Sequence, residues 1–265
     1  MSYLEINGTR LEYEWLETTP GLPAAAAAAP ASPTLVFLHE GLGSTALWKD
    51  FPARAVAATG CPALVYSRYG YGKSESLHEP RGVDYMHREA LQTLPAVLEA
   101  LSVDNPFLIG HSDGASIALI YTGARRGPVR GLVLMAPHVF VEDITCNSIA
   151  QAKITFETTE LPVRLGRYHD DVQSAFWGWN DIWLHPDFRA WNIEAFLQGV
   201  EVPALLIQGE DDQYGTRAQV DAVARQVSGP VTTLMLSDCG HSPHVDQKET
   251  TLGAIAEFVT RPAAG

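Results

Sequence analysis

A serine between two glycines lies where an apolar run gives way to a helical pattern. Residues 107–119 read FLIGHSDGASIAL, and Ser112 is the central residue of a Gly-x-Ser-x-Gly motif. A sharp strand–turn–helix requires an unusual backbone conformation at the serine, and the glycines leave room for it. The turn lifts the hydroxyl away from the backbone and directs the first amides of the helix toward it. Ser112 is therefore a candidate nucleophile, although a serine that only caps a helix gives the same short pattern.

Such a serine needs a general base within hydrogen-bonding distance, because an alkoxide does not form readily at neutral pH. Of the nine histidines, His241 lies in a loop of small residues that follows an apolar run ending at Leu236. Loops at the carboxyl ends of strands form the sites of α/β proteins, so this loop can reach the serine. His241 is the predicted base, and His244 is the alternative. His111 is expected to pack or hydrogen-bond nearby, because adjacent side chains on a sharp turn point in different directions.

The base needs a carboxylate on its second ring nitrogen, which fixes the tautomer and stabilises the imidazolium. Glu210, Asp211 and Asp212 follow the apolar run at 204–207. Local physics does not separate these neighbours, because a one-residue shift in the turn changes which carboxylate points inward. With Asp212 as the acid, the chain order is serine, acid, histidine, which differs from the orders of two groups of serine protease. The alternative for Asp212 is to cap a helix that starts near Thr216.

A metal site is the competing interpretation of this region. His241, His244 and Asp246 are close in sequence, but Pro243 lies between the two histidines. The spacing His-x-x-His does not match the i, i+4 spacing of zinc ligands on a helix. No other cluster of histidine and cysteine is near in the sequence. We therefore expect neither a metal nor a cofactor.

Length and composition set wider limits. With 265 residues, of which 46% are hydrophobic, the chain suits one large domain or a core with an insertion. The net charge of −13 argues against binding to nucleic acid or an anionic membrane. Cys61, Cys146 and Cys239 show no disulfide pattern, and neither a signal peptide nor a membrane-spanning run is apparent. These features predict a soluble cytoplasmic protein with a small-molecule substrate, and they leave a homodimer open.

Apolar runs and helical patterns alternate along most of the chain. A hairpin is predicted from residues 3–6 and 10–17, joined at Asn7-Gly8, and a surface loop is predicted at 20–33. Buried strands and helices are predicted near 35–38, 45–58, 62–66, 84–102, 106–110, 114–126, 131–135, 204–207, 216–227, 231–236 and 248–260. This alternation is typical of a parallel sheet built from βαβ units. Residues 138–200 interrupt it, because they lack a strand-like run and hold four of the six tryptophans.

Four features together resemble the α/β-hydrolase fold. They are the serine motif, HEGLGS from residue 39, SRYGYGKS from residue 67, and GEDD from residue 209 followed by CGHS from residue 239. The resemblance covers nearly the whole chain and implies an α/β fold, with a mostly parallel sheet of about eight strands flanked by helices. It also implies a core domain of residues 1–137 and 201–265, with a helical cap (138–200) inserted after the sixth strand. It favours Asp212 over Asp211, so the implied catalytic triad is Ser112, Asp212 and His241.

The resemblance also implies an oxyanion hole of two backbone N–H groups. One belongs to Asp113, whose side chain could meet either neighbouring loops or the substrate. The other comes from the loop after the strand at 35–38, where family members usually have His-Gly and this chain has a glutamate, Glu40, in the place of the glycine. Alignment assigns this donor to Gly41, with Leu42 as the alternative. Glu40 is expected to be a structural partner of Arg68, or else to lie near the site and affect substrate choice.

The tryptophans of 138–200 form the core of the insertion, or line an apolar pocket between it and the sheet. Leu42, Trp177 and Trp183 are the predicted substrate-binding residues. The expected function is a serine hydrolase that cleaves a small carboxylic ester with an apolar or aromatic portion through an acyl-enzyme intermediate. A C–C bond hydrolase of ring-fission products, an amidase or a lactonase would use the same triad. A non-catalytic ligand-binding relative is a further alternative.

Overall fold

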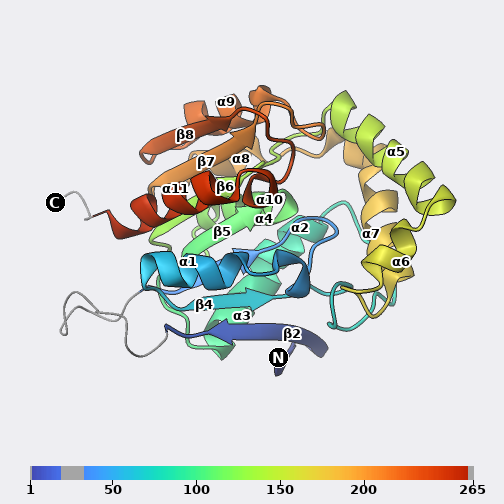
Figure 1. Ribbon diagram of the computed structural model, residues 1–265, viewed down its shortest axis with the longest axis horizontal. Coiled ribbons are helices and arrows are strands. Elements are labelled where there is room, and N and C mark those ends of the chain that lie inside the picture. Colours follow the sequence, from blue (N-terminus) through green and yellow to red (C-terminus); the bar gives the residue numbers. More distant parts are fainter. Residues whose placement is uncertain (1, 19–32, 262–265) are drawn as a thin grey trace.

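A computed structural model describes residues 2–18 and 33–261 (Figure 1). Its single sheet has eight strands in the order β1-β2-β4-β3-β5-β6-β7-β8. The strands are β1 (Ser2–Ile6), β2 (Thr9–Leu16), β3 (Leu35–Leu38), β4 (Ala63–Tyr66), β5 (Phe107–His111), β6 (Gly131–Met135), β7 (Ala204–Gly209) and β8 (Val231–Leu236). Only β1 and β2 pair antiparallel to their neighbours. The predicted sheet of about eight mostly parallel strands is therefore confirmed.

Helices fill the intervals between most of the parallel strands. The α-helices are α1 (Phe51–Thr59), α2 (Tyr85–Arg88), α3 (Leu94–Ala100), α4 (Asp113–Gly123), α5 (Asp143–Thr158), α6 (Leu161–Leu165), α7 (Val172–Trp183), α8 (Glu194–Leu197), α9 (Arg217–Gln226), α10 (Pro243–Asp246) and α11 (Lys248–Thr260). Two 3₁₀ helices, η1 (Ala46–Trp48) and η3 (Pro186–Ala190), and one π-helix, η2 (Glu89–Thr93), complete the described elements. None of the helices in the described ranges is long and apolar enough to cross a membrane.

The N-terminal hairpin turns at Asn7 and Gly8, as predicted. Both residues have positive φ, of 53° and 79°, and Ile6 pairs with Thr9. Positive φ at both central residues is the geometry whose twist matches that of the paired strands, and Asn-Gly adopts it at low cost. The predicted surface loop at 20–33 lies outside the described residues, apart from its last position.

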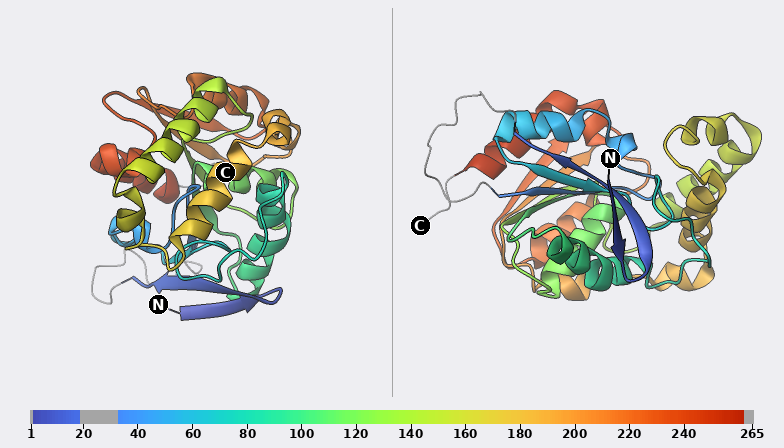
Figure 2. Two further views of the ribbon diagram at one scale, coloured as in Figure 1. Left: turned by 90° about the vertical axis from the view of Figure 1, so that its right-hand side faces the viewer. Right: turned by 90° about the horizontal axis from the view of Figure 1, so that it is seen from below.

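The sheet is covered on both faces, which explains why its central strands are apolar throughout. Every residue of β3, β4, β5 and β6 is buried. Figure 2 shows α1 and α11 on one face and the helices α2, α3, α4, α8 and α9 on the other. Strands that are buried on both faces need no polar alternation. The outer strand β8 is largely half-exposed, and its sequence is correspondingly mixed.

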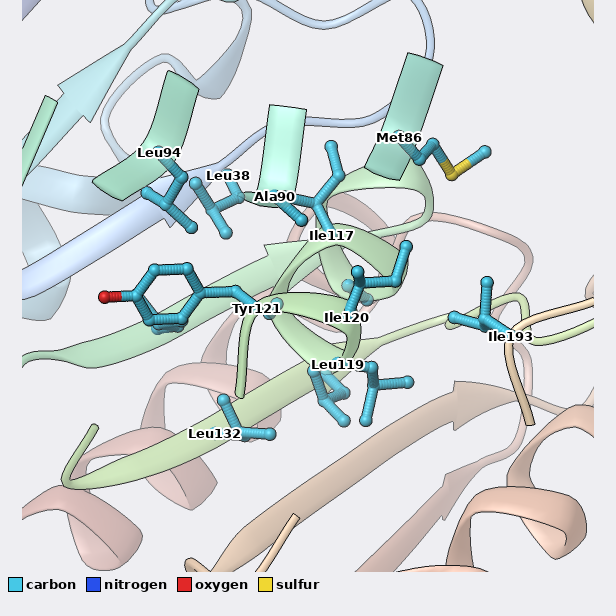
Figure 3. Close-up of a cluster of buried hydrophobic side chains, with 14 of the residues drawn as sticks. Leu38, Met86, Ala90, Leu94, Ile117, Leu119, Ile120, Tyr121, Leu132 and Ile193 are labelled. Carbon is cyan, nitrogen blue, oxygen red and sulfur yellow. The ribbon is translucent and has the colours of Figure 1, made fainter. Parts of the chain in front are cut away.

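Helix α4, which follows the serine motif, is buried on nearly all sides. Ile117, Ile120 and Tyr121 on α4 lie among the side chains of α2 and α3 and of the strands below (Figure 3). At the start of α4, a Cβ on Gly114 would lie 1.9 Å from the carbonyl oxygen of Leu38. Only glycine allows the helix to begin this close to the end of β3. The serine and the loop after β3 are therefore held near each other by backbone packing.

The helix predicted at 84–102 contains a π-helical segment, η2, between α2 and α3. Pro95 lies at the start of α3 and has no N–H to donate to the carbonyl of Leu91, four residues earlier. The proline ring also crowds that carbonyl, and a wider turn relieves the clash. The widened segment places the buried Glu89 carboxylate 2.8 Å from the Tyr66 hydroxyl, which donates to it.

Substitution of a sheet residue beneath α4 tests this packing. Leu132 on β6 is fully buried, and Leu132→Ala should lower the free energy of unfolding by about 2–5 kcal/mol, because it removes apolar contacts and leaves a cavity. Urea denaturation followed by circular dichroism measures the change. The control Val163→Ala, at a side chain that is 68% exposed, should change it by less than about 0.5 kcal/mol. Equal losses in the two variants would contradict the packing described.

Candidate active site

Ser112 occupies the strained turn that its motif predicts. Its φ of 52° and ψ of −116° lie in a region that residues with a Cβ rarely adopt. The Ser112 N–H donates to the carbonyl of Met135 at 2.9 Å, and the Ser112 carbonyl accepts from Ala115 and Ser116. These hydrogen bonds fix Ser112 between β5, β6 and α4, and 7% of its surface is exposed. The turn therefore presents the hydroxyl while fixing the backbone beneath it.

The structure brings Ser112, Asp212 and His241 together. The Nε2 atom of His241 lies 2.9 Å from the Ser112 hydroxyl oxygen, and Nδ1 lies 2.9 Å from both carboxylate oxygens of Asp212. A carboxylate accepts only, so the neutral ring carries its proton on Nδ1 and leaves Nε2 free to accept from the serine hydroxyl. One imidazole thus connects the hydroxyl to the carboxylate.

Asp212, rather than Asp211, points inward at the end of β7. Its carboxylate also accepts from the backbone N–H groups of Tyr214 at 2.8 Å and Gly215 at 3.2 Å, and from the Gln208 side chain at 2.8 Å. Burial alone would raise the pKa of Asp212, but the hydrogen bond and charge of His241 hold it below its usual range. Asp211 is exposed. The helix-capping alternative is not observed, because the side chain of Thr216 itself caps α9.

The alternative base, His244, makes no hydrogen bond with the Ser112 hydroxyl among the described residues. Its ring packs on Trp48 with 4.8 Å between centroids and on Phe51 with 5.5 Å. Burial lowers the pKa of His244 to about 3, so the ring is neutral at physiological pH. His244 is therefore a buried aromatic packing residue in this structure.

Three backbone amides near the serine have no hydrogen-bond partner among the described residues. They belong to Asp113, at the start of α4, and to Gly41 and Leu42, in the loop after β3. Gly41, Leu42 and Ser112 all line one cavity. A Cβ on Gly41 would lie 2.2 Å from Nε1 of Trp179, so only glycine fits against this indole. The amide of Asp113 follows Ser112 directly in the chain, and the other two belong to residues of the cavity wall.

A side chain between α6 and α7 helps to hold this loop. His169, between α6 and α7, donates from Nε2 to the carbonyl of Leu42 at 3.0 Å. Its Nδ1 accepts from the N–H of Gly72 at 2.9 Å, so both ring nitrogens are used in the neutral state. Burial keeps the pKa of His169 below its usual value. The imidazole therefore ties the loop after β3 to the turn after β4.

Of the two roles expected for Glu40, a side-chain pairing with Arg68 is not observed, whereas a position near the site is, because Glu40 lines the cavity with Ser112. The Arg68 guanidinium donates to the backbone carbonyl of Glu40 at 2.9 Å and to the Asp113 carboxylate at 3.4 Å. The Asp113 carboxylate also accepts from the Tyr85 hydroxyl at 2.8 Å, so its side chain contacts neighbouring elements. The Glu40 carboxylate instead faces His111, at 3.4 Å.

His111, next to the nucleophile, faces two acceptors. Its Nδ1 faces the Glu40 carboxylate, and its Nε2 lies 2.7 Å from the carbonyl oxygen of His241. Only the imidazolium, with a proton on each nitrogen, can donate to both groups at once. Burial lowers the pKa of His111, but the Glu40 hydrogen bond and charge outweigh it and raise the pKa above its usual value. The ion pair connects the loop that carries His241 to the loop after β3.

A cavity of about 120 Å³ lies at the Ser112 hydroxyl. The predicted residues Leu42 and Trp183 line it, but Trp177 does not. Trp177 instead donates to the Gln173 side chain and lines a separate surface hollow of about 350 Å³ beside residues 77–81. Trp179 takes its place in the wall, because residues 179 and 183 are one helical turn apart on α7, whereas 177 and 183 lie on different faces. The helical spacing of these residues indicates that Trp179, rather than Trp177, shares a face of α7 with Trp183.

A second lining residue, His138, was missed by the sequence interpretation. It follows the carboxyl end of β6, and its ring lies 5.6 Å from that of His241. The position itself was the available signal, because loops at this edge of a parallel sheet form ligand sites.

Metal-ligating and thiol groups contribute little to this region. No group of three or more histidine, cysteine, aspartate or glutamate side chains suited to a metal ion occurs in residues 2–18 and 33–261. Cys61, Cys146 and Cys239 are free thiols. Burial raises the pKa of Cys239 to about 11, which makes its thiolate scarce at neutral pH.

Replacement of Glu40 tests the ion pair through its pH dependence. Folding lowers the pKa of Glu40, so this group stabilises the fold at pH values above its ordinary pKa of 4.5. Folding raises the pKa of His111, so this group stabilises the fold at pH values below its ordinary pKa of 6.5. Glu40→Gln should therefore lower the free energy of unfolding most, by about 1–3 kcal/mol, between these pH values, where both groups are charged. The cost should shrink as acid protonates Glu40 and as pH rises through the folded-state pKa of His111.

Urea denaturation across pH 4–9 measures this difference between wild type and variant. Glu157→Gln, at an exposed glutamate of α5, is the matched control and should show no such maximum. A cost of Glu40→Gln that stays constant across the range would argue against a charged His111.

Comparisons with known proteins agree with this architecture. A model of the alpha/beta hydrolase family matches residues 35–253. Among similar solved structures, an esterase from Exiguobacterium antarcticum has a TM-score of 0.75 and 18% identity, with 97% of this chain and 98% of that chain covered. The enol-lactonase from Burkholderia xenovorans LB400 has a TM-score of 0.74 and 18% identity, with 98% of this chain and 100% of that chain covered. A proline iminopeptidase from Mycobacterium smegmatis gives 0.74 and 17%, with 97% of each chain covered.

A search of curated proteins found no match. The structural neighbours are named for different reactions, and at these identities the likeness establishes the fold alone. The family match covers most of the chain, from β3 into α11, and includes the turn of Ser112 and the loops of Asp212 and His241. The resemblance noted in the sequence is thereby confirmed, and the chain belongs to the alpha/beta hydrolase family.

Proposed function

We propose that this protein is a serine hydrolase that cleaves small carboxylic esters through an acyl-enzyme intermediate. The observation that carries the proposal is the single imidazole of His241, which lies 2.9 Å from the Ser112 hydroxyl and 2.9 Å from the Asp212 carboxylate. A serine that only caps a helix requires neither partner. The amides without partners beside the hydroxyl support the same chemistry, because acyl transfer develops negative charge there.

The proposed reaction uses these groups in two stages. The Ser112 oxygen attacks the acyl carbon while His241 Nε2 takes its proton and Asp212 stabilises the imidazolium. The N–H groups of Asp113 and Gly41, with Leu42 as the alternative to Gly41, donate to the tetrahedral oxyanion. Collapse expels the alcohol, which receives the proton from His241. Water then attacks the acyl-enzyme, its proton passes to His241, and the acid leaves with Ser112 restored.

The inserted segment is proposed as a cap over the catalytic cavity, with residues 1–137 and 201–265 as the core domain. Helices α5 and α7 supply wall residues of the cavity, among them Ile149, Trp179 and Trp183. These helices lie to one side of the layers that cover the sheet (Figures 1 and 2). A cap of this kind excludes bulk water from the acyl-enzyme while leaving a small enclosed site for the substrate.

Amides, lactones and ring-fission diketones need the same nucleophile, so turnover must decide among them. Hydrolysis of methyl butanoate, butyrolactone, butyramide and a vinylogous 1,5-diketone by the wild-type protein separates these reactions. Ester turnover well above the other three supports the proposal. Turnover of the diketone alone would replace it with C–C bond hydrolysis. Covalent labelling by a fluorophosphonate without turnover of any of them would indicate a non-catalytic relative.

Loss of the nucleophile gives the first test. Ser112→Ala should lower kcat for ester hydrolysis by about 10⁴- to 10⁶-fold, because no covalent intermediate can form. Circular dichroism should show an unchanged fold. The control Ser102→Ala, at an exposed serine in the turn after α3, should retain activity within about twofold. Appreciable esterase activity in purified Ser112→Ala would mean that another residue performs the reaction.

The adjacent carboxylates give a matched pair for the second test. Asp212→Asn should lower kcat by about 10⁴-fold, because an amide donates to Nδ1 and stabilises the wrong tautomer of His241. Asp211→Asn, one residue away and exposed, should change kcat by less than about threefold. Ester hydrolysis and the rate of fluorophosphonate labelling provide the readouts. The opposite ranking would assign the acid to Asp211.

A further inference from the structure

His138 is a buried imidazole in the wall of the catalytic cavity, and no side chain or backbone group accounts for its polarity. It is 2% exposed, and its Nδ1 is buried on the side of Gly215 without a hydrogen-bond partner among the described residues, which leaves Nε2 as the ring nitrogen that a ligand in the cavity can reach. It lines the cavity with Ser112 and His241, and its ring packs edge-to-face against Trp183, with 5.3 Å between the ring centroids. Buried polar groups are nearly always paired, so an unpaired one beside a reaction centre needs an explanation.

The backbone around His138 is built to hold it there. Ala136, at the end of β6, has a φ of 47°, which is costly for a residue with a Cβ. The carbonyl of His138 accepts from the Ser116 hydroxyl at 2.6 Å, and the next N–H, of Val139, donates to the Gln219 side chain at 2.8 Å. Strain that neighbouring contacts maintain is frequent at functional sites.

The ring is neutral and can act as either donor or acceptor. Burial, followed by the nearby charge of His241, lowers the pKa of His138 to about 3. A neutral imidazole has one N–H and one acceptor nitrogen, and either tautomer is available when no partner selects one. His138 can therefore hydrogen-bond a hydroxyl or a carbonyl, but it offers no charge to a carboxylate.

The other charges of the cavity disfavour an anionic ligand. The Glu40 carboxylate lines the same cavity, and its hydrogen bond with His111 keeps its pKa low against the effect of burial. No lysine or arginine lines the cavity within the described part of the chain. The His111 ring, whose pKa is raised, already faces two acceptors. A carboxylate on the substrate would thus approach an anion with no free cation to bind it.

We propose that His138 recognises the substrate by a hydrogen bond to an uncharged polar group, so that the substrate is a small neutral ester with a hydroxyl or oxo substituent. This inference rests on the proposed ester hydrolysis and narrows its substrate class. The cavity volume of about 120 Å³ restricts the substituted portion to a few heavy atoms. A site with an unpaired buried polar group discriminates strongly against analogues that cannot pair with it.

Steady-state kinetics with matched esters test this assignment. The probes are methyl butanoate, its 2-hydroxy, 3-hydroxy and 3-oxo derivatives, and methyl hydrogen succinate as the anionic analogue. His138→Leu should lower kcat/KM for at least one neutral polar ester about tenfold more than for methyl butanoate, since a leucine cannot form the hydrogen bond. His138→Gln should restore part of this difference. Comparing each ester across variants cancels the intrinsic reactivity of the ester.

Wild-type kcat/KM for methyl hydrogen succinate should lie at least about tenfold below that for methyl butanoate. The assignment is overturned if His138→Leu lowers kcat/KM for all neutral esters by the same factor, or if the wild type has a higher kcat/KM for the anionic ester than for methyl butanoate. The first result would make His138 a packing residue only, and the second would show a cation site that the described residues lack.

A binding measurement separates this inference from the proposed reaction. In Ser112→Ala, the ring ¹H–¹³C resonance of His138, assigned by its absence in His138→Gln, should shift when the preferred polar ester is added and shift less with methyl butanoate. Equal shifts for all esters, or none, would overturn the inference without reference to turnover. If no ester is hydrolysed and fluorophosphonate does not label Ser112, the proposed reaction fails, and the resonance still reports whether His138 binds the polar ester.

Discussion

One imidazole has to contact a hydroxyl and a carboxylate at the same time, and the rest of the structure serves this requirement. Ser112 and Asp212 lie 129 and 29 residues from His241 along the chain. They meet because β5, β7 and β8 are parallel, so the loops that follow them leave the sheet at one edge. A slip of one residue in the pairing of these strands would turn the inward side chains outward. The apolar interior that fixes the register therefore also fixes the site.

The histidines around this site show how burial and partners assign different roles to one residue type. Burial lowers the pKa values of His138 and His244 to about 3, and the charges of the nearby Asp212 and Glu40 carboxylates do not offset it. His111 is equally buried but faces Glu40, and its pKa is raised. His169 uses both nitrogens in neutral hydrogen bonds between loops. The identity of the contacting group, rather than the degree of burial, decides which of them is charged.

The sequence was sufficient for the parts of the molecule that local patterns determine. The hairpin at Asn7-Gly8, the apolar strands and the turn of Ser112 follow from turn chemistry, periodicity and glycine spacing. The side-chain partners of Glu40 were not predictable, because Arg68 could satisfy either Glu40 or Asp113 and only the fold decides. Aromatic content alone does not separate Trp177 from Trp179, because only the phase of α7 decides which of them faces the cavity. His138 was missed because no sequence motif surrounds it.

The contact between Gly41 and Trp179 has a consequence for how relatives of this protein can diverge. A Cβ at position 41 would lie 2.2 Å from the indole, so the space between the backbone of residue 41 and the Trp179 ring is too small for a side chain. A homologue with any larger residue at position 41 must therefore carry a smaller one at 179. The two positions should covary, and a chain that changes only one of them would lose either the path of the loop or the floor of its binding pocket.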